Sequence, residues 1–289
     1  MLFWKDTMAR LIARVRIPLV VLGALLALAG RFWDGAGSLS TAGSAVIFAG
    51  LVCCFLIGTV RANPMRLRLP VLGRWVALNS PANRVPSHGV HAYGQTYAVD
   101  LVYDPLERPR PAFGSGLGFR PPSDFPAFGQ PVLAPADGVV VRVRDRARDH
   151  RSRNSWLGIG YVLVEGVLRE LSGPGRILGN HIVLDLGDGV YAALAHLRQH
   201  SARVGAGDAV RAGQHIADCG NSGNSTEPHL HLQLMDRPQV LVAAGLPMDF
   251  EDFEVGGERR SGMPRNKEPF TAPRNTALPD SPALPDQPA

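Results

Sequence analysis

Two histidines separated by a single residue, His229 and His231, carry the strongest chemical signal in this chain. They follow a turn rich in Gly, Asn and Ser at 220–226, and leucines alternate with them. In a β-strand, side chains at positions i and i+2 point to the same face. The two imidazoles are therefore expected to project side by side, with the leucines on the opposite face. Neighbouring neutral imidazoles are typical of a zinc site in which one binds the metal and the other handles protons.

Further residues of metal-binding type lie upstream of this pair. His88 and His91 precede Asp100, and His196 lies near the end of a strand-like segment. Asp100 falls within the apolar segment 96–103, where an unpaired carboxylate is unfavourable. A metal ion would compensate this charge, and a salt bridge to one of the many arginines is the alternative. Because a catalytic zinc ion usually takes three protein ligands and leaves one position for water, these residues suffice for one site.

The composition limits both the fold class and the partners. The 289 residues include 32 Gly and 24 Pro, and only 19% are charged, which favours an all-β fold of short strands and turns. The net charge is +5, but the sequence has no basic helix or aromatic-interleaved basic patch, so no nucleic acid is expected as a partner. A basic domain also suits membrane lipid head groups or an anionic cell wall. The three cysteines indicate no disulfide framework.

Residues 1–62 predict a membrane-anchoring region with one or two transmembrane helices. Segment 17–30 is uncharged but short for a membrane span, and it resembles the apolar part of a signal sequence. Segment 42–60 is uncharged and long enough to cross a bilayer. Residues 63–77 are interpreted as a linker to the next domain.

Residues 78–250 predict one compact domain of short strands joined by turns. Two long segments inside it, 105–129 and 144–178, are rich in Pro, Gly and Arg and are interpreted as insertion loops. The Pro-rich residues 251–289 are interpreted as a disordered tail. Strands are expected at 96–103, on both sides of the turn at 136–138, and in a hairpin formed by 181–186 and 190–197.

Four segments of this domain match a known family in order and spacing. Together they resemble the lysostaphin-type zinc metalloendopeptidases, and the similarity covers about residues 80–236. The resemblance implies a compact antiparallel β-sandwich, the duplicated hybrid motif, that binds one zinc ion and cleaves peptide bonds of bacterial peptidoglycan. The four segments are 179–189, 191–197, 204–214 and 220–231.

The same resemblance implies roles for four residues. Asp100 and His231 become zinc ligands, while His196 and His229 assist catalysis without binding the metal. Zinc would then activate a water molecule, and one of the two assisting histidines would accept its proton or stabilise the developing oxyanion. Which of the two acts as the base stays open at this point.

The first zinc ligand departs from the common pattern. The family often has a histidine four residues before the aspartate, but Thr96 occupies that position before Asp100. This departure favours a longer variant in which a Ser-His-Gly turn supplies the ligand. That ligand would be His88, with His91 as the alternative.

The side of the membrane is contested by two arguments. Peptidoglycan lies outside the cell membrane, which places the peptidase domain there. The arginines between 61 and 84, with no acidic residue among them, favour a cytoplasmic domain instead. A single crossing by segment 42–60, with segment 17–30 lying in the interface, reconciles the two and is the preferred interpretation.

A non-enzymatic wall-binding or regulatory protein that activates another wall hydrolase is the competing interpretation. The complete His/Asp/His set and both additional histidines favour the enzyme. The sequence gives no indication of the oligomeric state.

Overall fold

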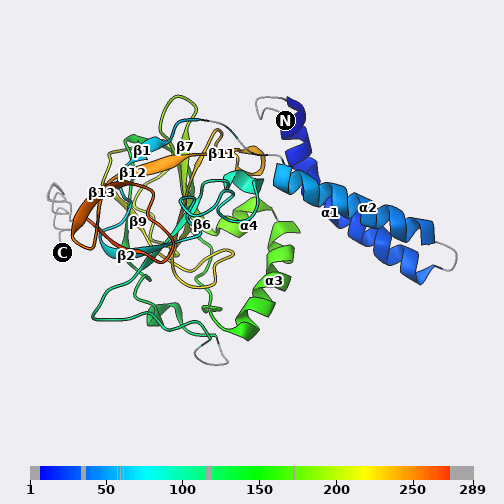
Figure 1. The fold of residues 1–289 in the computed structure, drawn as a ribbon, viewed down its shortest axis with the longest axis horizontal. Coiled ribbons are helices and arrows are strands. Elements are labelled where there is room, and N and C mark those ends of the chain that lie inside the picture. Colours follow the sequence, from blue (N-terminus) through cyan, green and yellow to red (C-terminus); the bar gives the residue numbers. More distant parts are fainter. Residues whose placement is uncertain are drawn as a thin grey trace, which may run out of the picture.

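The computed structural model describes residues 7–33, 37–56, 58, 60, 62–114, 119–171 and 173–273. Two long N-terminal helices extend away from a β-rich domain (Figure 1). The helices are α1 (Thr7–Phe32), α2 (Gly37–Leu56), α3 (Trp156–Leu171) and α4 (Pro174–Leu178), with 3-10 turns η1 (Ala92–Gly94), η2 (Pro122–Asp124) and η3 (Val240–Val242). The strands are β1 (Met65–Leu67), β2 (Gly73–Leu78), β3 (Val99–Tyr103), β4 (Pro131–Leu133), β5 (Gly138–Arg144), β6 (Asn180–Asp185), β7 (Tyr191–Leu197), β8 (Ala209–Val210), β9 (His215–Asp218), β10 (Leu230–Met235), β11 (Gly245–Leu246), β12 (Met248–Val255), β13 (Glu258–Gly262) and β14 (Pro269–Ala272).

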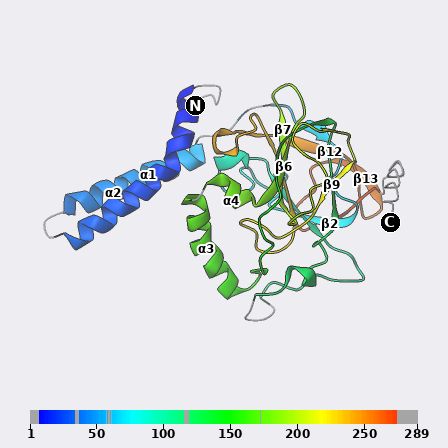
Figure 2. The ribbon, with the colours of Figure 1, turned by 180° about the vertical axis from the view of Figure 1, so that it is seen from behind.

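Helices α1 and α2 form an antiparallel pair whose tip lies far from the β-rich domain (Figures 1 and 2). A Cβ atom on Gly43 would lie 2.4 Å from the Ala27 nitrogen and 2.6 Å from the Gly23 oxygen, so this close approach requires glycine. Small residues at such contacts are typical of helices that associate in membranes. Leu11–Phe32 and Gly37–Cys54 are both apolar and long enough to cross a bilayer, by length and composition.

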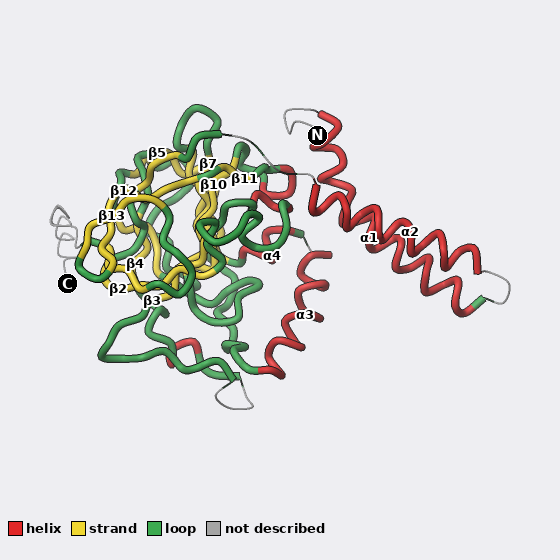
Figure 3. Tube along the Cα trace, viewed as in Figure 1, coloured by secondary structure: helices red, strands yellow, loops and turns green. Residues whose placement is uncertain are grey.

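This pairing changes the interpretation of segment 17–30. The segment belongs to α1, one helix of 26 residues, which at 1.5 Å per residue measures about 39 Å. Helix α1 runs along α2 rather than apart from it (Figure 3). Segment 17–30 is therefore part of a long helix paired with α2 rather than a separate short segment, and α1 begins at the end of the pair that meets the domain.

The β-rich domain is built on one long, mostly antiparallel sheet, so the predicted all-β fold behind apolar helices is confirmed. A 12-stranded sheet follows the order β1-β12-β14-β2-β3-β10-β7-β6-β5-β8, with β11 on β10 and β13 on β12. β4 and β9 form a separate two-stranded sheet, and β1 pairs with β12 in parallel. The predicted strands correspond to β3, to β4 and β5, and to the hairpin of β6 and β7.

The domain extends further at both ends than the sequence indicates. β1 and β2 lie in the segment 63–77 that we interpreted as a linker, and β12, β13 and β14 reach into the predicted tail at 251–289. Phe253 and Phe270 from these last strands are buried in the main core. The composition conceals these strands because β13 consists of exposed or half-buried polar residues and glycine. Residues 274–289 lie outside the described part of the chain.

The predicted loop at 144–178 contains two helices, whereas the described part of 105–129 is irregular apart from η2, as expected. Helix α3 is hard to recognise in the sequence because Gly158, Gly160 and Gly166 lower its helix propensity. It lies on the side of the domain that faces the helix pair (Figure 1).

We expect Phe270→Ala to lower the free energy of unfolding by about 3–5 kcal/mol, because the substitution leaves a cavity in the core. Denaturant unfolding of the purified full chain in detergent, followed by near-ultraviolet circular dichroism, measures this change. Thr271→Ala alters the exposed neighbour on β14 and should change stability by less than about 0.5 kcal/mol. Equal, small effects of both substitutions would contradict the place of β14 in the domain.

Candidate metal centre and catalytic site

The middle of the sheet places Asp100 opposite His231. Asp100 lies on β3 and His231 on β10, and the two are direct cross-strand partners. The leucines of β10 are buried in the main core, so the alternation of the strand turns His231 and Gln233 to the other face. This is the orientation predicted from the sequence.

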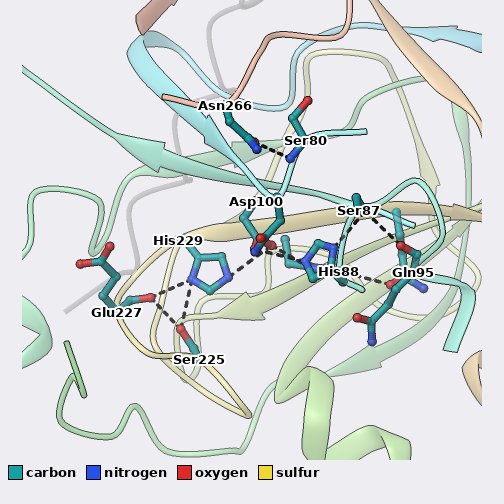
Figure 4. Close-up of polar contacts among 12 residues, drawn as sticks. Ser80, Ser87, His88, Gln95, Asp100, Ser225, Glu227, His229 and Asn266 are labelled. Atoms are coloured by element: carbon teal, nitrogen blue, oxygen red, sulfur yellow. Dashed lines mark hydrogen bonds and ion pairs between the residues drawn. The ribbon is translucent and has the colours of Figure 1, made fainter. Parts of the chain in front are cut away.

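His88 joins this pair from the loop before η1. One ligand atom each from His88, Asp100 and His231 lies within 4.8 Å of the others. His88 Nε2 is 3.2 Å from Asp100 Oδ2 (Figure 4), and His231 Nδ1 is 2.9 Å from Asp100 Oδ1. His91, the alternative first ligand, lies outside this group, with its Nδ1 3.0 Å from Thr96 Oγ1.

Gln233 fixes the position of the proton on His231. The Gln233 side-chain nitrogen donates to the Tyr93 carbonyl at 2.8 Å. The Gln233 oxygen therefore accepts from His231 Nε2, which is also 2.8 Å away. With its proton on Nε2, His231 keeps a lone pair on Nδ1, and this lone pair faces Asp100. Hydrogen bonds of this kind orient metal-binding imidazoles.

Ser87 has the corresponding effect on His88. The Ser87 hydroxyl donates to the Gln95 carbonyl at 3.1 Å, so it accepts from His88 Nδ1, 3.1 Å away (Figure 4). His88 Nε2 is thereby left with a lone pair that faces Asp100. Both imidazoles thus present acceptors to the carboxylate.

The arrangement of these three groups fits a bound cation. Two imidazole lone pairs and a carboxylate converge with no proton between them, and a cation makes such a set of acceptors favourable. Burial acts to raise the pKa of Asp100, whereas the positive charge that His88 and His229 carry when protonated lowers that pKa well below its usual range. With both imidazoles neutral, a bound cation takes over this compensating charge. Two neutral imidazoles and one carboxylate are also a common donor set of catalytic zinc sites.

A β-bulge turns His196 out of the core. In the β6–β7 ladder, His181 lies opposite Ala195 and Asn180 opposite Leu197, which leaves His196 as an extra residue. Its φ of +60° lies in the left-handed region, where residues other than glycine are uncommon. The bulge returns Leu197 to the core, and the His196 ring lies 4.8 Å from that of His229.

Backbone carbonyls accept hydrogen bonds from Nδ1 of both His196 and His229, so both rings carry their proton on Nδ1. His196 Nδ1 donates to the Ser222 carbonyl at 2.9 Å. His229 Nδ1 donates to the Glu227 carbonyl at 2.8 Å, and the Ser225 hydroxyl donates to that same carbonyl (Figure 4). Both imidazoles therefore carry their lone pair on Nε2, and His229 Nε2 is 3.5 Å from Asp100 Oδ1.

The two imidazoles differ in basicity. Burial lowers the pKa of His196, and the neighbouring His229 and His231 lower it further. Burial also acts to lower the pKa of His229, but the adjacent Asp100 carboxylate outweighs it and raises that pKa. His229 is thus the stronger base of the pair.

The glycine-rich turn at 220–226 supplies the carbonyl that holds His196. Gly223 has a φ of +73°, and a Cβ atom there would lie 2.4 Å from the Gly179 nitrogen. Only glycine permits this contact between the turn and the start of β6. The close contact fixes the position of Ser222, and through it that of His196.

Sequence reasoning identified the imidazoles but not the residues that orient them. Gln233 could have been found, because it lies two residues after His231 and so on the same strand face. Ser87 adjoins His88 in the Ser-His-Gly turn. Asn79, whose side-chain nitrogen donates to Asp100 Oδ2 at 2.8 Å, gave no signal, since it comes from β2 and the following turn.

Residues 123–241 match the model of peptidase family M23. The chain carries an M23 peptidase domain. It is therefore a hydrolase of the metallopeptidase type that acts on peptide bonds, and the lysostaphin-type resemblance is confirmed. His196, His229 and His231 lie inside the matched segment, whereas His88 and Asp100 precede it.

Several solved structures of peptidases are similar to this chain. The catalytic domain of the prophage-encoded M23 protein EnpA from Enterococcus faecalis, solved as a mutant, is 22% identical over 47% of this chain and 85% of that chain, with a TM-score of 0.28. The catalytic domain of the antimicrobial peptidase lysostaphin from Staphylococcus simulans is 26% identical over 45% of this chain and 86% of that chain, with a TM-score of 0.27. A zinc-containing peptidase from Vibrio cholerae is 21% identical over 52% of this chain and 50% of that chain, with a TM-score of 0.27.

The geometry predicts how substitutions change metal binding. We expect His231→Ala and Asp100→Ala each to abolish stoichiometric zinc, because each removes an acceptor that faces the other two. Gln233→Leu should weaken zinc binding about 10–100-fold, because it frees the imidazole that it orients. Zinc content by elemental analysis and affinity by competition with a chromophoric chelator measure these effects on the purified full chain.

Two variants serve as controls for this prediction. Gln233→Glu keeps an acceptor oxygen for His231 Nε2 and should bind zinc more tightly than Gln233→Leu. His91→Ala should leave one zinc per chain. Loss of zinc from His91→Ala together with full zinc binding by His88→Ala would show that His91, and not His88, is the first zinc ligand.

Proposed function

We propose that this chain is a membrane-anchored zinc metalloendopeptidase that hydrolyses peptide bonds of bacterial cell-wall peptidoglycan. The observation that carries the proposal is the convergence of three acceptors, on His88, Asp100 and His231, within 4.8 Å. The M23 domain supports the reaction class, and the resemblance to lysostaphin-type enzymes supports peptidoglycan peptides as the substrate.

Each residue of the site has a role in this proposal. His88 Nε2, Asp100 and His231 Nδ1 hold one zinc ion. When bound, zinc supplies a Lewis acid that polarises the scissile carbonyl and lowers the pKa of water. His229 is placed to accept the proton of the attacking water, because its Nε2 carries the lone pair and lies 3.5 Å from Asp100 Oδ1, beside the metal ligands. Burial lowers the pKa of His196 and keeps it neutral, so its Nε2 has no proton to donate before the reaction. After His229 has taken the proton of the water, the neighbouring His196 Nε2 is placed to accept that proton from it.

The helix pair supports the anchoring part of the proposal. Both α1 and α2 carry a segment long and apolar enough to cross a bilayer. Because they are antiparallel, the start of α1 and the peptidase domain lie at the same end of the pair (Figure 2). The proposal places this end outside the cell, where peptidoglycan lies, and the tip between α1 and α2 in the cytoplasm.

We expect His196→Ala and His229→Ala to retain zinc and to lose at least about a hundredfold in the rate of peptide hydrolysis, as for a lost acid-base group. The assay follows cleavage of purified peptidoglycan and of its isolated stem and cross-bridge peptides by chromatography and mass spectrometry. His91→Ala, which leaves the zinc ligands and both assisting histidines intact, is the matched control. Near-normal rates for both active-site variants would refute the catalytic roles.

A wild-type chain that holds one zinc but cleaves none of these substrates would support the competing regulatory function. Addition of the zinc-loaded chain to another wall hydrolase then tests activation directly. Stimulation that persists in His229→Ala would establish a role without hydrolysis.

We expect opposite labelling at the two ends of the helix pair in intact cells. Ser261→Cys places an exposed thiol on β13 of the peptidase domain, and Ser38→Cys places one at the exposed tip of the pair. A membrane-impermeant maleimide should label position 261 before lysis and position 38 only afterwards. The chain without either introduced cysteine serves as the background.

The other outcomes are equally informative. Labelling of position 38 but not 261 before lysis would place the domain in the cytoplasm, as the arginines at 61–84 favour, and would contradict a wall substrate. Equal labelling of both positions before lysis would show that the pair does not cross the membrane.

A further inference from the structure

Helix α3 presents apolar side chains to the outside of the domain. Trp156, Leu157 and Tyr161 are 78%, 65% and 50% exposed. Of the charged side chains of α3 that the structure describes, Glu165 and Arg169 pair with each other, and Glu165 also contacts Arg153 just before the helix. A surface helix of a soluble protein normally has the opposite arrangement, with its apolar side facing the core. The three exposed apolar side chains lie in the first turns of α3, where Trp156 and Tyr161 also contact Phe113 and Phe119, and together they fit an apolar environment beside the domain.

The position of α3 relative to the helix pair shows what that environment is. Helix α1 contacts α3, and α3 lies on the side of the domain from which the pair extends (Figures 1 and 2). Its axis runs across the axis of the pair in both views. A bilayer crossed by α1 and α2 would thus lie along α3, which is the orientation of a helix at a membrane interface.

A basic cavity adjoins this side of the domain. It has a volume of about 820 Å³ and is lined by three arginines, Arg14 of α1, Arg142 of β5 and Arg237 beyond β10. None of its lining residues carries a carboxylate. The cavity is continuous with the helix pair, because Arg14 belongs to α1 itself. Three guanidinium groups without a neutralising acid are suited to phosphate groups.

The positive charge continues beside α4. Arg144, Arg148 and Arg176 are exposed and line a second cavity next to the first, since Arg142 and Arg144 belong to the same strand. The acid that lines this second cavity, Glu165, already contacts Arg153 and Arg169. The basic residues therefore retain charge for an external anion.

We propose that α3 and these two arginine-lined cavities form a membrane-docking face that holds the peptidase domain flat against an anionic lipid bilayer. The apolar side of α3 enters the interface, and the arginines bind phosphate groups of anionic phospholipids. The inference rests on the proposed crossing of α1 and α2 but goes beyond it, since a tethered domain need not lie on the surface. Apolar area and basic residues are the two contributions that bind interfacial helices to anionic membranes.

Docking would have a direct consequence for the enzyme. The helix pair already contacts the domain, through α1 with η3 and α3 and through Ala13 packed with Ala244. A contact of α3 with the bilayer would hold that orientation relative to the membrane. The cluster of His88, Asp100 and His231 would then lie at a constant height above the bilayer. Substrate peptides close to the membrane would be favoured over distant ones.

A fluorescent probe on α3 tests the proposal with the full chain. Leu157→Cys, in a background in which Cys53, Cys54 and Cys219 are replaced by Ala, is labelled with the environment-sensitive dye NBD. Ser261→Cys on β13, at the opposite end of the domain (Figure 1), is the matched control. Both proteins are reconstituted in vesicles of phosphatidylcholine alone or with phosphatidylglycerol, and insertion is checked by co-flotation.

We expect NBD at position 157, but not at 261, to shift to the blue and to be quenched by spin-labelled lipid in vesicles that contain phosphatidylglycerol. The double variant Arg142→Glu/Arg237→Glu should reduce the docked-to-undocked ratio about tenfold or more, because each basic residue near an anionic surface adds to binding. Arg259→Glu/Arg260→Glu on β13 should leave the ratio unchanged. High salt should weaken docking, because it screens these charges.

The outcomes separate this proposal from the anchoring that it rests on. Co-flotation without any response at position 157 would leave the anchor intact and overturn docking. Failure to co-float with either kind of vesicle would overturn both. Co-flotation only with anionic vesicles would refute insertion of the helix pair, and with it the orientation of the bilayer on which the docking proposal rests.

Two further results would also overturn the proposal. An equal response at 157 in neutral and anionic vesicles, unchanged by the Arg142 and Arg237 reversals, would refute the role of the arginines. If inorganic phosphate abolishes the response while sodium chloride of the same ionic strength does not, the cavity is a site for a small free anion rather than for the bilayer.

Discussion

The buried carboxylate of Asp100 is the group on which the rest of the site depends. An ionised carboxylate at the centre of a β-sheet is unfavourable without a compensating charge, and the two nearest imidazoles do not supply a proton to it. Gln233 and Ser87 hold the protons of His231 and His88 on their far nitrogens. The surrounding hydrogen bonds thus prepare three acceptors for a cation. The polar residues around the centre are arranged to keep protons away from it.

The sheet provides this precision through one regular and one irregular feature. The regular feature is the register of β3 with β10, which sets Asp100 opposite His231 and commits the leucines of β10 to the core. The irregular feature is the bulge at His196, which interrupts the alternation of β7. Without the bulge, His196 would follow Leu194 toward the core, and the site would contain one imidazole fewer. The regular strand register therefore orients Asp100 and His231, whereas the bulge and its strained backbone orient His196.

In the proposed arrangement, the helix pair and α3 place the site relative to a membrane. The helix pair is held together by close contact at glycine, and α3 with its neighbouring arginines occupies the side of the domain nearest to that pair. None of the residues that form the candidate metal centre belongs to these features. They are consistent with an enzyme that works at a lipid surface, where position and orientation determine which peptides the site can reach.

The sequence by itself determined the chemistry: His229 and His231 on one strand face, Asp100 in an apolar strand, and His196 as a fourth candidate, because residue type and alternation are local properties. It also determined that the fold is β-rich behind two apolar segments. Only the tertiary structure decided between His88 and His91, because loop conformation sets which of them reaches Asp100. It alone revealed Gln233, Ser87 and Asn79 as orienting groups, since hydrogen bonds between distant segments leave no periodic pattern. The structure also shows two helices in the expected loop at 144–178 and strands in the first part of the expected tail. Glycines make the helix hard to recognise in the sequence, and exposed polar residues do the same for β13, where pairing with β12 outweighs local propensity.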